Sequence, residues 1–198
     1  MQKTIAFFDF DGTITTSDTM LELIKFAKGK PAYYLGMIIL SPYLIALKCG
    51  LVTATAAKEK LLSLFFGKIP LNEFNNTCTE FSDKILPGLI RRAALNKIKE
   101  HQDNNDEVVV VCASAENWIS QWCLRNNINY LATRLEVING KLSGKLSGPN
   151  CNGEEKAIKI RSAYDLSQYD EIYAYGDSSG DKAMLGLATK SFYKPFRQ

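Results

Sequence analysis

Short apolar runs, each closed by small or acidic residues, constrain the fold of this chain more than any other feature. Three of them are Thr4 to Phe10, Val108 to Cys112 and Ile172 to Tyr175, and Ser191 to Tyr193 is a fourth candidate. Runs of this length without polar alternation are typical of strands covered on both faces of a parallel sheet. The last three follow segments with helical periodicity, such as Leu89 to His101. This alternation predicts an α/β fold with a parallel sheet.

Residues 16–85 interrupt the alternation, because they contain helical patterns and no convincing strand. Helix breakers separate the patterns, so we interpret the region as an inserted helical cap domain on a core domain of residues 1–15 and 86–198. The predicted cap helices are Thr19 to Lys28, Ala32 to Lys48, Ala54 to Phe66 and Leu71 to Ile85. Later in the chain, Asn139-Gly140 predicts the turn of a hairpin within Glu136 to Gly148.

The composition excludes several function classes. The 24 basic and 21 acidic residues give a net charge of +3 without a clustered basic stripe, so a nucleic-acid partner is not expected. The five cysteines are widely spaced and form no CxxC pair, and there is one histidine, which argues against a disulfide framework and a zinc site. We therefore expect a cytoplasmic protein.

Two carboxylates lie two residues apart at the end of the first apolar run, in Asp9-Phe10-Asp11-Gly12. Strand alternation turns both toward the same side, and open α/β sheets bind ligands at the carboxyl ends of their strands. Such a pair can act as nucleophile and general acid/base while its oxygens hold a hard cation. Gly12 lets the backbone approach a ligand. Taken alone, these residues could also simply end the strand in a turn.

A second acidic pair, Asp177 and Asp181, follows the third apolar run. Four acids at two strand ends repel one another unless a cation lies among them, and oxygen ligands without nearby His or Cys favour magnesium. Ser114 follows the second run, where its hydroxyl can bind a phosphate oxygen or cap the next helix. Lys156 begins a predicted helix and can neutralise a phosphate, although a lone lysine is usually a solvated surface charge.

Four motifs follow one another along the chain: DFDGT, a strand ending in Ser, GEEK and GDSSGD. In this order they resemble the motifs of the haloacid dehalogenase-like superfamily, subfamily IB, the phosphoserine phosphatase-like branch. The resemblance covers essentially the whole chain and implies a Rossmann-like core with a helical cap. It implies a Mg²⁺-dependent phosphatase that hydrolyses a small-molecule phosphomonoester through an aspartyl-phosphate. It implies that Asp9 is the nucleophile and a metal ligand, and that Asp11 is the general acid/base and contacts the metal, also through its backbone carbonyl. Gly12, Ser114 and Lys156 are implied to bind the phosphate. Asp177 and Asp181 are implied to bind the metal.

The cap departs from the phosphoserine phosphatases in the residues that hold the substrate. Those enzymes are expected to bind the substrate amine with a Glu after the first motif and its carboxylate with a cap arginine. This chain has Asp18 near the first position and no arginine before Arg91, so Lys58 or Lys60 is the candidate cation. Gly180 replaces the Asn usual in the last motif. Phosphoserine is therefore not the favoured substrate.

The segment 31–47, PAYYLGMIILSPYLIAL, carries no charged residue. As a helix it would be roughly 25 Å long, which is marginal for a membrane span, and Gly36 and Pro42 weaken that interpretation further. It is either a helix packed in the core of the cap or a surface for lipid or a long apolar substrate. A similar segment occurs in members resembling phosphatidylglycerophosphate phosphatases, so a lipid phosphate is the second substrate class, with peripheral membrane contact through 31–47.

Two other functions use the same chemistry. A phosphorylated signalling receiver keeps its reactive Asp at the end of a middle strand, whereas the corresponding run here ends in Cys112-Ala113-Ser114. A phosphotransferase or mutase differs only in whether an alcohol, rather than water, accepts the phosphoryl group. Among the remaining residues, Trp118 and Trp122 are expected to pack a helix on the sheet, and His101 is expected to be exposed at a helix end.

Overall fold

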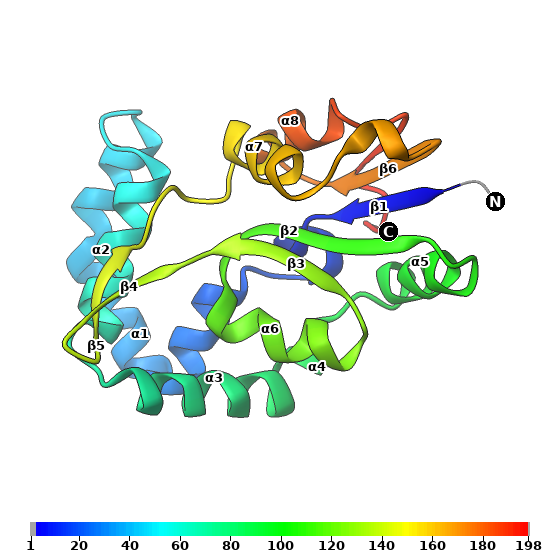
Figure 1. Cartoon of the computed structure of the whole chain (residues 1–198). Helices are drawn as coiled ribbons and strands as arrows, with labels where there is room; N and C mark the ends of the chain where they lie inside the picture. Colours follow the sequence, from blue (N-terminus) through cyan, green and yellow to red (C-terminus); the bar gives the residue numbers. More distant parts are fainter. Residues whose placement is uncertain (1–2, 198) are drawn as a thin grey trace.

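A five-stranded parallel sheet forms the centre of the fold, in the order β3-β2-β1-β6-β7 (Figure 1). Every neighbouring pair in this sheet is parallel, so the predicted α/β fold is confirmed. The protein is seen in a computed structural model that describes residues 3–197. The strands of the sheet are β1 (Thr4–Phe8), β2 (Glu107–Ala115), β3 (Asn129–Thr133), β6 (Glu171–Gly176) and β7 (Lys190–Tyr193).

Helices cover both faces of the sheet because both faces are apolar. In β1, Ile5 and Phe7 belong to the cluster beneath α7 (Glu154–Ala163) and α8 (Lys182–Leu185). Ala6 and Phe8 point the other way, into the larger cluster beneath α5 (Arg92–Asp103) and α6 (Glu116–Arg125). All four side chains are fully buried, as a strand covered on both faces requires.

The helices α1 (Thr19–Lys48), α2 (Ala54–Phe66) and α3 (Leu71–Lys84) fill the region of the predicted cap, and the short α4 (Leu86–Leu89) follows. The chain leaves helical geometry at Gly29, with φ 78° and ψ 156°, so α1 consists of two helices, as the sequence predicts. The hairpin of β4 (Leu135–Ile138) and β5 (Lys141–Leu146) packs against α2, on the left of Figure 1. Core residues thus contact the cap helices, and the exact domain boundary stays a prediction.

The turn of this hairpin forms where Asn139-Gly140 predicts it. Both residues have positive φ, at 51° and 73°, which is the geometry of the two-residue turn that such a pair favours. The register pairs Val137 with Leu142 and Ile138 with Lys141. The hairpin therefore projects from the sheet toward α2 with a fixed register.

Two expectations about the core need revision. His101 is not exposed but buried, because Ala94, Ile98 and His101 share the inner face of α5. Its ring nitrogens lie 2.7 Å from an Asp106 oxygen and 2.9 Å from the Tyr175 hydroxyl. The strand β3 was not expected at all, because the apolar run in its sequence NYLAT is short and has polar residues at both ends. Trp118 and Trp122 pack in the core as predicted.

Candidate active site

A cavity of about 610 Å³ lies where the carboxyl ends of β1, β2 and β6 face α1 and α2. Its base consists of polar side chains from the core, and its outer wall consists of apolar side chains from α1 and α2. All the predicted site residues line it. They are Asp9, Asp11, Gly12, Asp18, Ser114, Lys156, Asp177 and Asp181.

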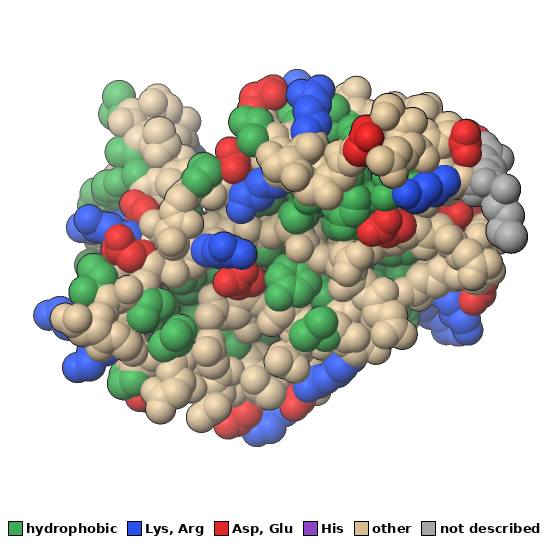
Figure 2. All heavy atoms as spheres, viewed as in Figure 1, with side chains coloured by type: hydrophobic (Ala, Val, Ile, Leu, Met, Phe, Trp, Pro, Cys, Tyr) green, Lys and Arg blue, Asp and Glu red, His purple; other side chains and the backbone are tan. Residues whose placement is uncertain are grey.

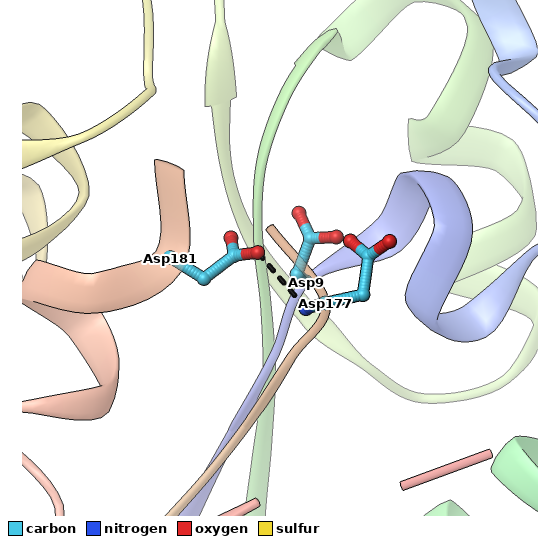
Figure 3. A group of neighbouring side chains, drawn as sticks. All are labelled: Asp9, Asp177 and Asp181. Atoms are coloured by element: carbon cyan, nitrogen blue, oxygen red, sulfur yellow. Dashed lines mark hydrogen bonds between the residues drawn. The ribbon is translucent and has the colours of Figure 1, made fainter. Parts of the chain in front are cut away.

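Asp9, Asp177 and Asp181 form one buried acidic group (Figure 3). Asp9 directly follows β1, Asp177 directly follows β6, and Asp181 lies four residues further on. One carboxylate oxygen from each lies within 4.8 Å of the other two. Asp181 is held in place because its Oδ2 accepts hydrogen bonds from the N–H groups of Asp177 and Ser178, at 3.0 and 2.9 Å. Adjacent parallel strands thus bring distant acids together at one edge of the sheet.

Lys156 reaches this group from the first turn of α7. Its Nζ lies 2.5 Å from Asp9 Oδ1 and 2.7 Å from Asp181 Oδ1. Only 1% of the lysine side chain is exposed. Lys156 is therefore an internal counter-ion of the acids, and the surface interpretation of this lysine is wrong.

The acids and the lysine titrate differently because of this arrangement. Burial raises the pKa of Asp9 to about 7, although the Lys156 ammonium opposes the shift. Burial also acts on Asp181, but Lys156 and the hydrogen bonds from Ser178 hold the pKa of that carboxyl below its ordinary value. Burial alone would lower the pKa of Lys156, but Asp9 and Asp181 raise it above its ordinary value. Lys156 therefore stays charged at neutral pH, and Asp9 retains its charge less readily than Asp181.

The Asp11 carboxylate lines the same cavity but turns away from the acidic group. The backbone N–H and the hydroxyl of Thr19 donate to Asp11 Oδ1, at 2.8 and 2.7 Å. The Ser114 hydroxyl donates to Asp11 Oδ2 at 2.5 Å. The strand alternation used for the prediction ends early, because β1 stops at Phe8 and Asp11 lies in a turn. Metal binding through the Asp11 side chain therefore lacks support, while contact through its backbone carbonyl stays a prediction.

The turn after Asp9 depends on Gly12. Its φ is +83°, and a Cβ at this position would lie 2.5 Å from Asp177 Oδ2. A side chain there would collide with the Asp177 carboxylate and displace it. Three buried carboxylates at these separations, with space kept open by a glycine, fit a hard divalent cation such as Mg²⁺.

Two residues that contact the candidate site have no signal in the sequence motifs. Thr19 begins α1, orients Asp11, and accepts a hydrogen bond from Trp118 Nε1 at 3.1 Å. Arg197, at the end of the described chain, pairs with Asp177 and lines the cavity. The preceding Phe196 anchors this segment by stacking on Tyr175, with ring centroids 5.7 Å apart. These contacts come from tertiary structure, so neither residue could be assigned from local patterns.

Lys58, not Lys60, is the cap lysine that enters the cavity. Its Nζ donates to the Ala113 carbonyl at 2.6 Å and to Asn150 Oδ1 at 3.1 Å, and burial lowers its pKa. Lys60 is exposed. Lys58 thus places a positive charge on the cap side of the cavity, next to the residue that precedes Ser114.

Asp18 begins α1 as its N-cap, and its carboxylate accepts from the Leu21 N–H at 3.1 Å. The surrounding protein and the Asp11 carboxylate raise the pKa of Asp18 to about 6. Its predicted role in substrate binding stays a prediction, since capping alone accounts for an Asp at this position.

Comparison with known proteins identifies similar chains over nearly the full length. The model of the haloacid dehalogenase-like hydrolase family matches residues 6–186. Protein CicA of Caulobacter vibrioides is 30% identical over 196 residues, which is 96% of this chain and 85% of CicA.

Solved structures share the fold at lower sequence identity. A protein of unknown function from Bordetella pertussis Tohama I has a TM-score of 0.83 and 21% identity, covering 96% of this chain and 89% of that one. A substrate-bound phosphoserine phosphatase has a TM-score of 0.71 and 19% identity, covering 98% and 86%. A phospho-aspartyl intermediate analogue of phosphoserine phosphatase has a TM-score of 0.70 and 19% identity, covering 96% and 86%. These structural similarities show the fold.

Proposed function

The chain belongs to the haloacid dehalogenase-like hydrolase family, and from this premise we propose that it is a Mg²⁺-dependent phosphatase that forms an aspartyl-phosphate on Asp9. The observation that carries the proposal is the convergence of Asp9, Lys156, Asp177 and Asp181 in one buried group. Solved structures of phosphoserine phosphatases with the same fold include a phospho-aspartyl analogue, which supports this chemistry. The substrate is a small phosphomonoester whose phosphate fits the polar base of the cavity.

In the first step, an Asp9 carboxylate oxygen attacks phosphorus and the bond from phosphorus to the ester oxygen breaks. Asp11, in its protonated form, gives its proton to the departing alcohol. Lys156, 2.5 Å from Asp9, offsets the repulsion between this carboxylate and the phosphate dianion. Ser114 and Thr19 hold Asp11 in its orientation through the hydrogen bonds described above.

In the second step, Asp11 accepts a proton from water, the water oxygen bonds to phosphorus, and the bond from phosphorus to the Asp9 oxygen breaks, which releases inorganic phosphate. Asp11 thereby regains the proton it lost, and Asp9 regains its free carboxylate. The same carboxyl can serve as acid and then as base because the departing alcohol and the incoming water use the same face of the phosphoryl group.

Asp9, Asp177 and Asp181 would hold the Mg²⁺ ion through carboxylate oxygens. When bound, the ion supplies positive charge that stabilises the transferring phosphoryl group. Asp181 also contacts Lys156, so it would position both cations.

The proposal is tested by measuring phosphate release with Mg²⁺ from a panel of phosphomonoesters, including phosphoserine, sugar phosphates, nucleotides and a phosphatidylglycerophosphate. Asp9→Asn should lower kcat by at least about 10³-fold with an unchanged circular dichroism spectrum. The control is Asp103→Asn, the same substitution at an exposed position at the end of α5.

An acid-quenched single turnover with radiolabelled substrate separates the intermediate from direct attack by water. Wild-type protein should carry label that hydroxylamine removes, and Asp9→Asn should carry none. Full activity or equal labelling in Asp9→Asn would refute the assigned nucleophile. Transfer of label to an added alcohol instead of water would identify a phosphotransferase.

A lipid phosphate is the second candidate substrate, and a specific observation favours it. The outer wall of the cavity is formed by apolar side chains of α1 and α2, and Lys58 is the charged residue that α2 adds to it. This wall suits an acyl chain better than the polar body of phosphoserine. The wall residues are Met20, Leu21, Met37, Leu44, Leu47, Ala54, Ala57 and Leu61. Within the panel, a kcat/KM for phosphatidylglycerophosphate at least about tenfold above that for phosphoserine supports this candidate, and the reverse order excludes it.

A further inference from the structure

One face of α1 exposes large apolar side chains after the break at Gly29. The exposed fractions are 59% for Tyr34, 61% for Leu35, 68% for Ile38, 59% for Ile39 and 61% for Ile45. We call these five residues the docking face. Hydrophobic side chains are visible along the left edge of Figure 2, over the α1 and α2 region of Figure 1. Scattered exposed apolar residues are ordinary, but a continuous row on one helix marks an interaction surface.

The opposite face of the same helix belongs to the fold. Tyr33, Gly36 and Leu40 are buried, and a Cβ on Gly36 would lie 2.2 Å from the ring of Phe65 in α2. Helical spacing therefore divides the segment into an inner face, fixed against α2, and an outer docking face. The side chains of the docking face are apolar, although they are exposed and do not contribute to the packing of the cap.

The charge around the docking face points to an anionic partner. Between positions 23 and 58 the chain contains no Asp or Glu, and the exposed lysines of this stretch are Lys28, Lys30 and Lys48, although the whole chain carries 24 basic and 21 acidic residues. The lysines lie at both ends of the apolar stretch, where long side chains can reach headgroups while the apolar residues enter the lipid. A symmetric dimer through this face would bring the two sets of lysines together, which like-charge repulsion opposes.

The helix α1 is long and apolar enough to cross a membrane, by length and composition, with 30 residues and a mean hydropathy of 1.2 in its best window. Its first turns are nevertheless built into the protein, because Thr19, Leu23 and Ile24 are buried beside the site. The break at Gly29 and the contact with α2 leave one face of the remaining helix available. This geometry suits a helix that lies in the membrane surface rather than across it.

We propose that the docking face binds the surface of an anionic lipid membrane, with Lys28, Lys30 and Lys48 against the headgroups. Met37, Leu44 and Leu47 line the cavity from the inner side of the same helix, so the helix that docks is also part of the cavity wall. This inference goes beyond the phosphatase activity and does not depend on it, because membrane binding can be measured without turnover.

The test is co-sedimentation of the purified full chain with sucrose-loaded vesicles of phosphatidylcholine alone or with about 30% phosphatidylglycerol, at low and at high salt. The chain should bind the anionic vesicles, and salt should weaken the binding. Ile38→Gln combined with Ile39→Gln should weaken it at least about tenfold, because two large side chains leave the lipid. The matched control combines Leu124→Gln and Ile158→Gln, which are 61% and 53% exposed on other helices, and should bind as wild type.

Several results would overturn the proposal. These are no binding of the wild type to anionic vesicles, equal binding by the docking-face variant and its control, or retention of the chain in the bilayer after carbonate extraction. Dimerisation that the docking-face variant abolishes, without vesicle binding, would identify a second copy as the partner. Asp9→Asn should bind vesicles as wild type, so failure of the phosphatase proposal and failure of this one are distinguishable.

Discussion

Replacing Lys156 by methionine tests whether the acidic group depends on its internal counter-ion. The ammonium lies 2.5 Å from Asp9 and 2.7 Å from Asp181. At an effective dielectric constant of about 20, each pair contributes an attraction of about 6 kcal/mol. Moving three charges out of water costs several kcal/mol each, so the intact cluster adds little net stability.

Removing the lysine alone destabilises the protein, because the acids keep the cost of their desolvation and lose the attraction of the ammonium. Lys156→Met should therefore lower the free energy of unfolding by about 3–5 kcal/mol. This is a large share of the roughly 5–15 kcal/mol typical of a domain. Chemical denaturation monitored by circular dichroism measures the loss. Lys182→Met, at an exposed lysine on α8, is the control and should change stability by no more than about 0.5 kcal/mol.

A double variant tests the same coupling if Lys156→Met is too unstable to measure. Asp181→Asn in the Lys156→Met background removes one stranded charge, so the double variant should recover at least about 1 kcal/mol. Strict additivity of the two substitutions, or a loss below about 1 kcal/mol for Lys156→Met, would refute the view that these charges form one coupled unit.

Three further substitutions test the geometry of the site. Gly12→Ala adds a Cβ 2.5 Å from Asp177 Oδ2 at a φ of +83°, so we expect a loss of about 1–3 kcal/mol in stability by denaturation and weaker Mg²⁺ binding by calorimetry. Thr19→Val removes a buried hydroxyl that donates to Asp11 and should lower kcat about tenfold with little change in KM; a pure KM effect would contradict the positioning role. Arg197→Ala removes the ion pair between the partly exposed Arg197 and the buried Asp177, and should change stability by about 1 kcal/mol or less while raising KM; an unchanged KM would exclude a role in substrate binding.

The strands β1, β2 and β6 were predicted from continuous apolar residues, most of them buried, whereas the edge strand β7 was a candidate although all of its residues are exposed. β2 is buried over most of its length, and its run of valines makes it evident. β3 begins with an exposed residue, and its pairing with β2, from Val109 with Asn129 onward, decides its conformation. An edge strand of this kind takes its structure from a neighbour that is distant in sequence, so no local pattern indicates it.

The sequence predicted those residues of the candidate site that lie at the ends of strands. Asp9 and Asp177 end adjacent strands, so their convergence follows from the parallel topology. The orientation of Asp11 did not follow, because the turn after Phe8 breaks the alternation. The choice of Lys58 over Lys60 depends on the angle at which α2 faces the core, and spacing along one helix does not encode that angle.

In the last motif, the glycine at position 180 leaves room for the side chain of Asn152. Gly180 stands where the resemblance leads us to expect Asn. A Cβ at Gly180 would lie 2.0 Å from Asn152 Oδ1, so the amide of Asn152 fills that space from the loop before α7. Asn152 also lines the cavity.

This arrangement makes the two positions interdependent. Gly180→Asn should displace Asn152 and lower both the melting temperature and kcat/KM, because the new Cβ and the Asn152 amide oxygen cannot occupy the same volume. Adding Asn152→Gly removes the clash, so the double variant should exceed the Gly180→Asn variant in both quantities. Melting curves and initial rates of the two single variants and the double variant complete the cycle. If the two effects simply add, Asn152 does not fill the place of the missing side chain, and the loop before α7 has a separate role.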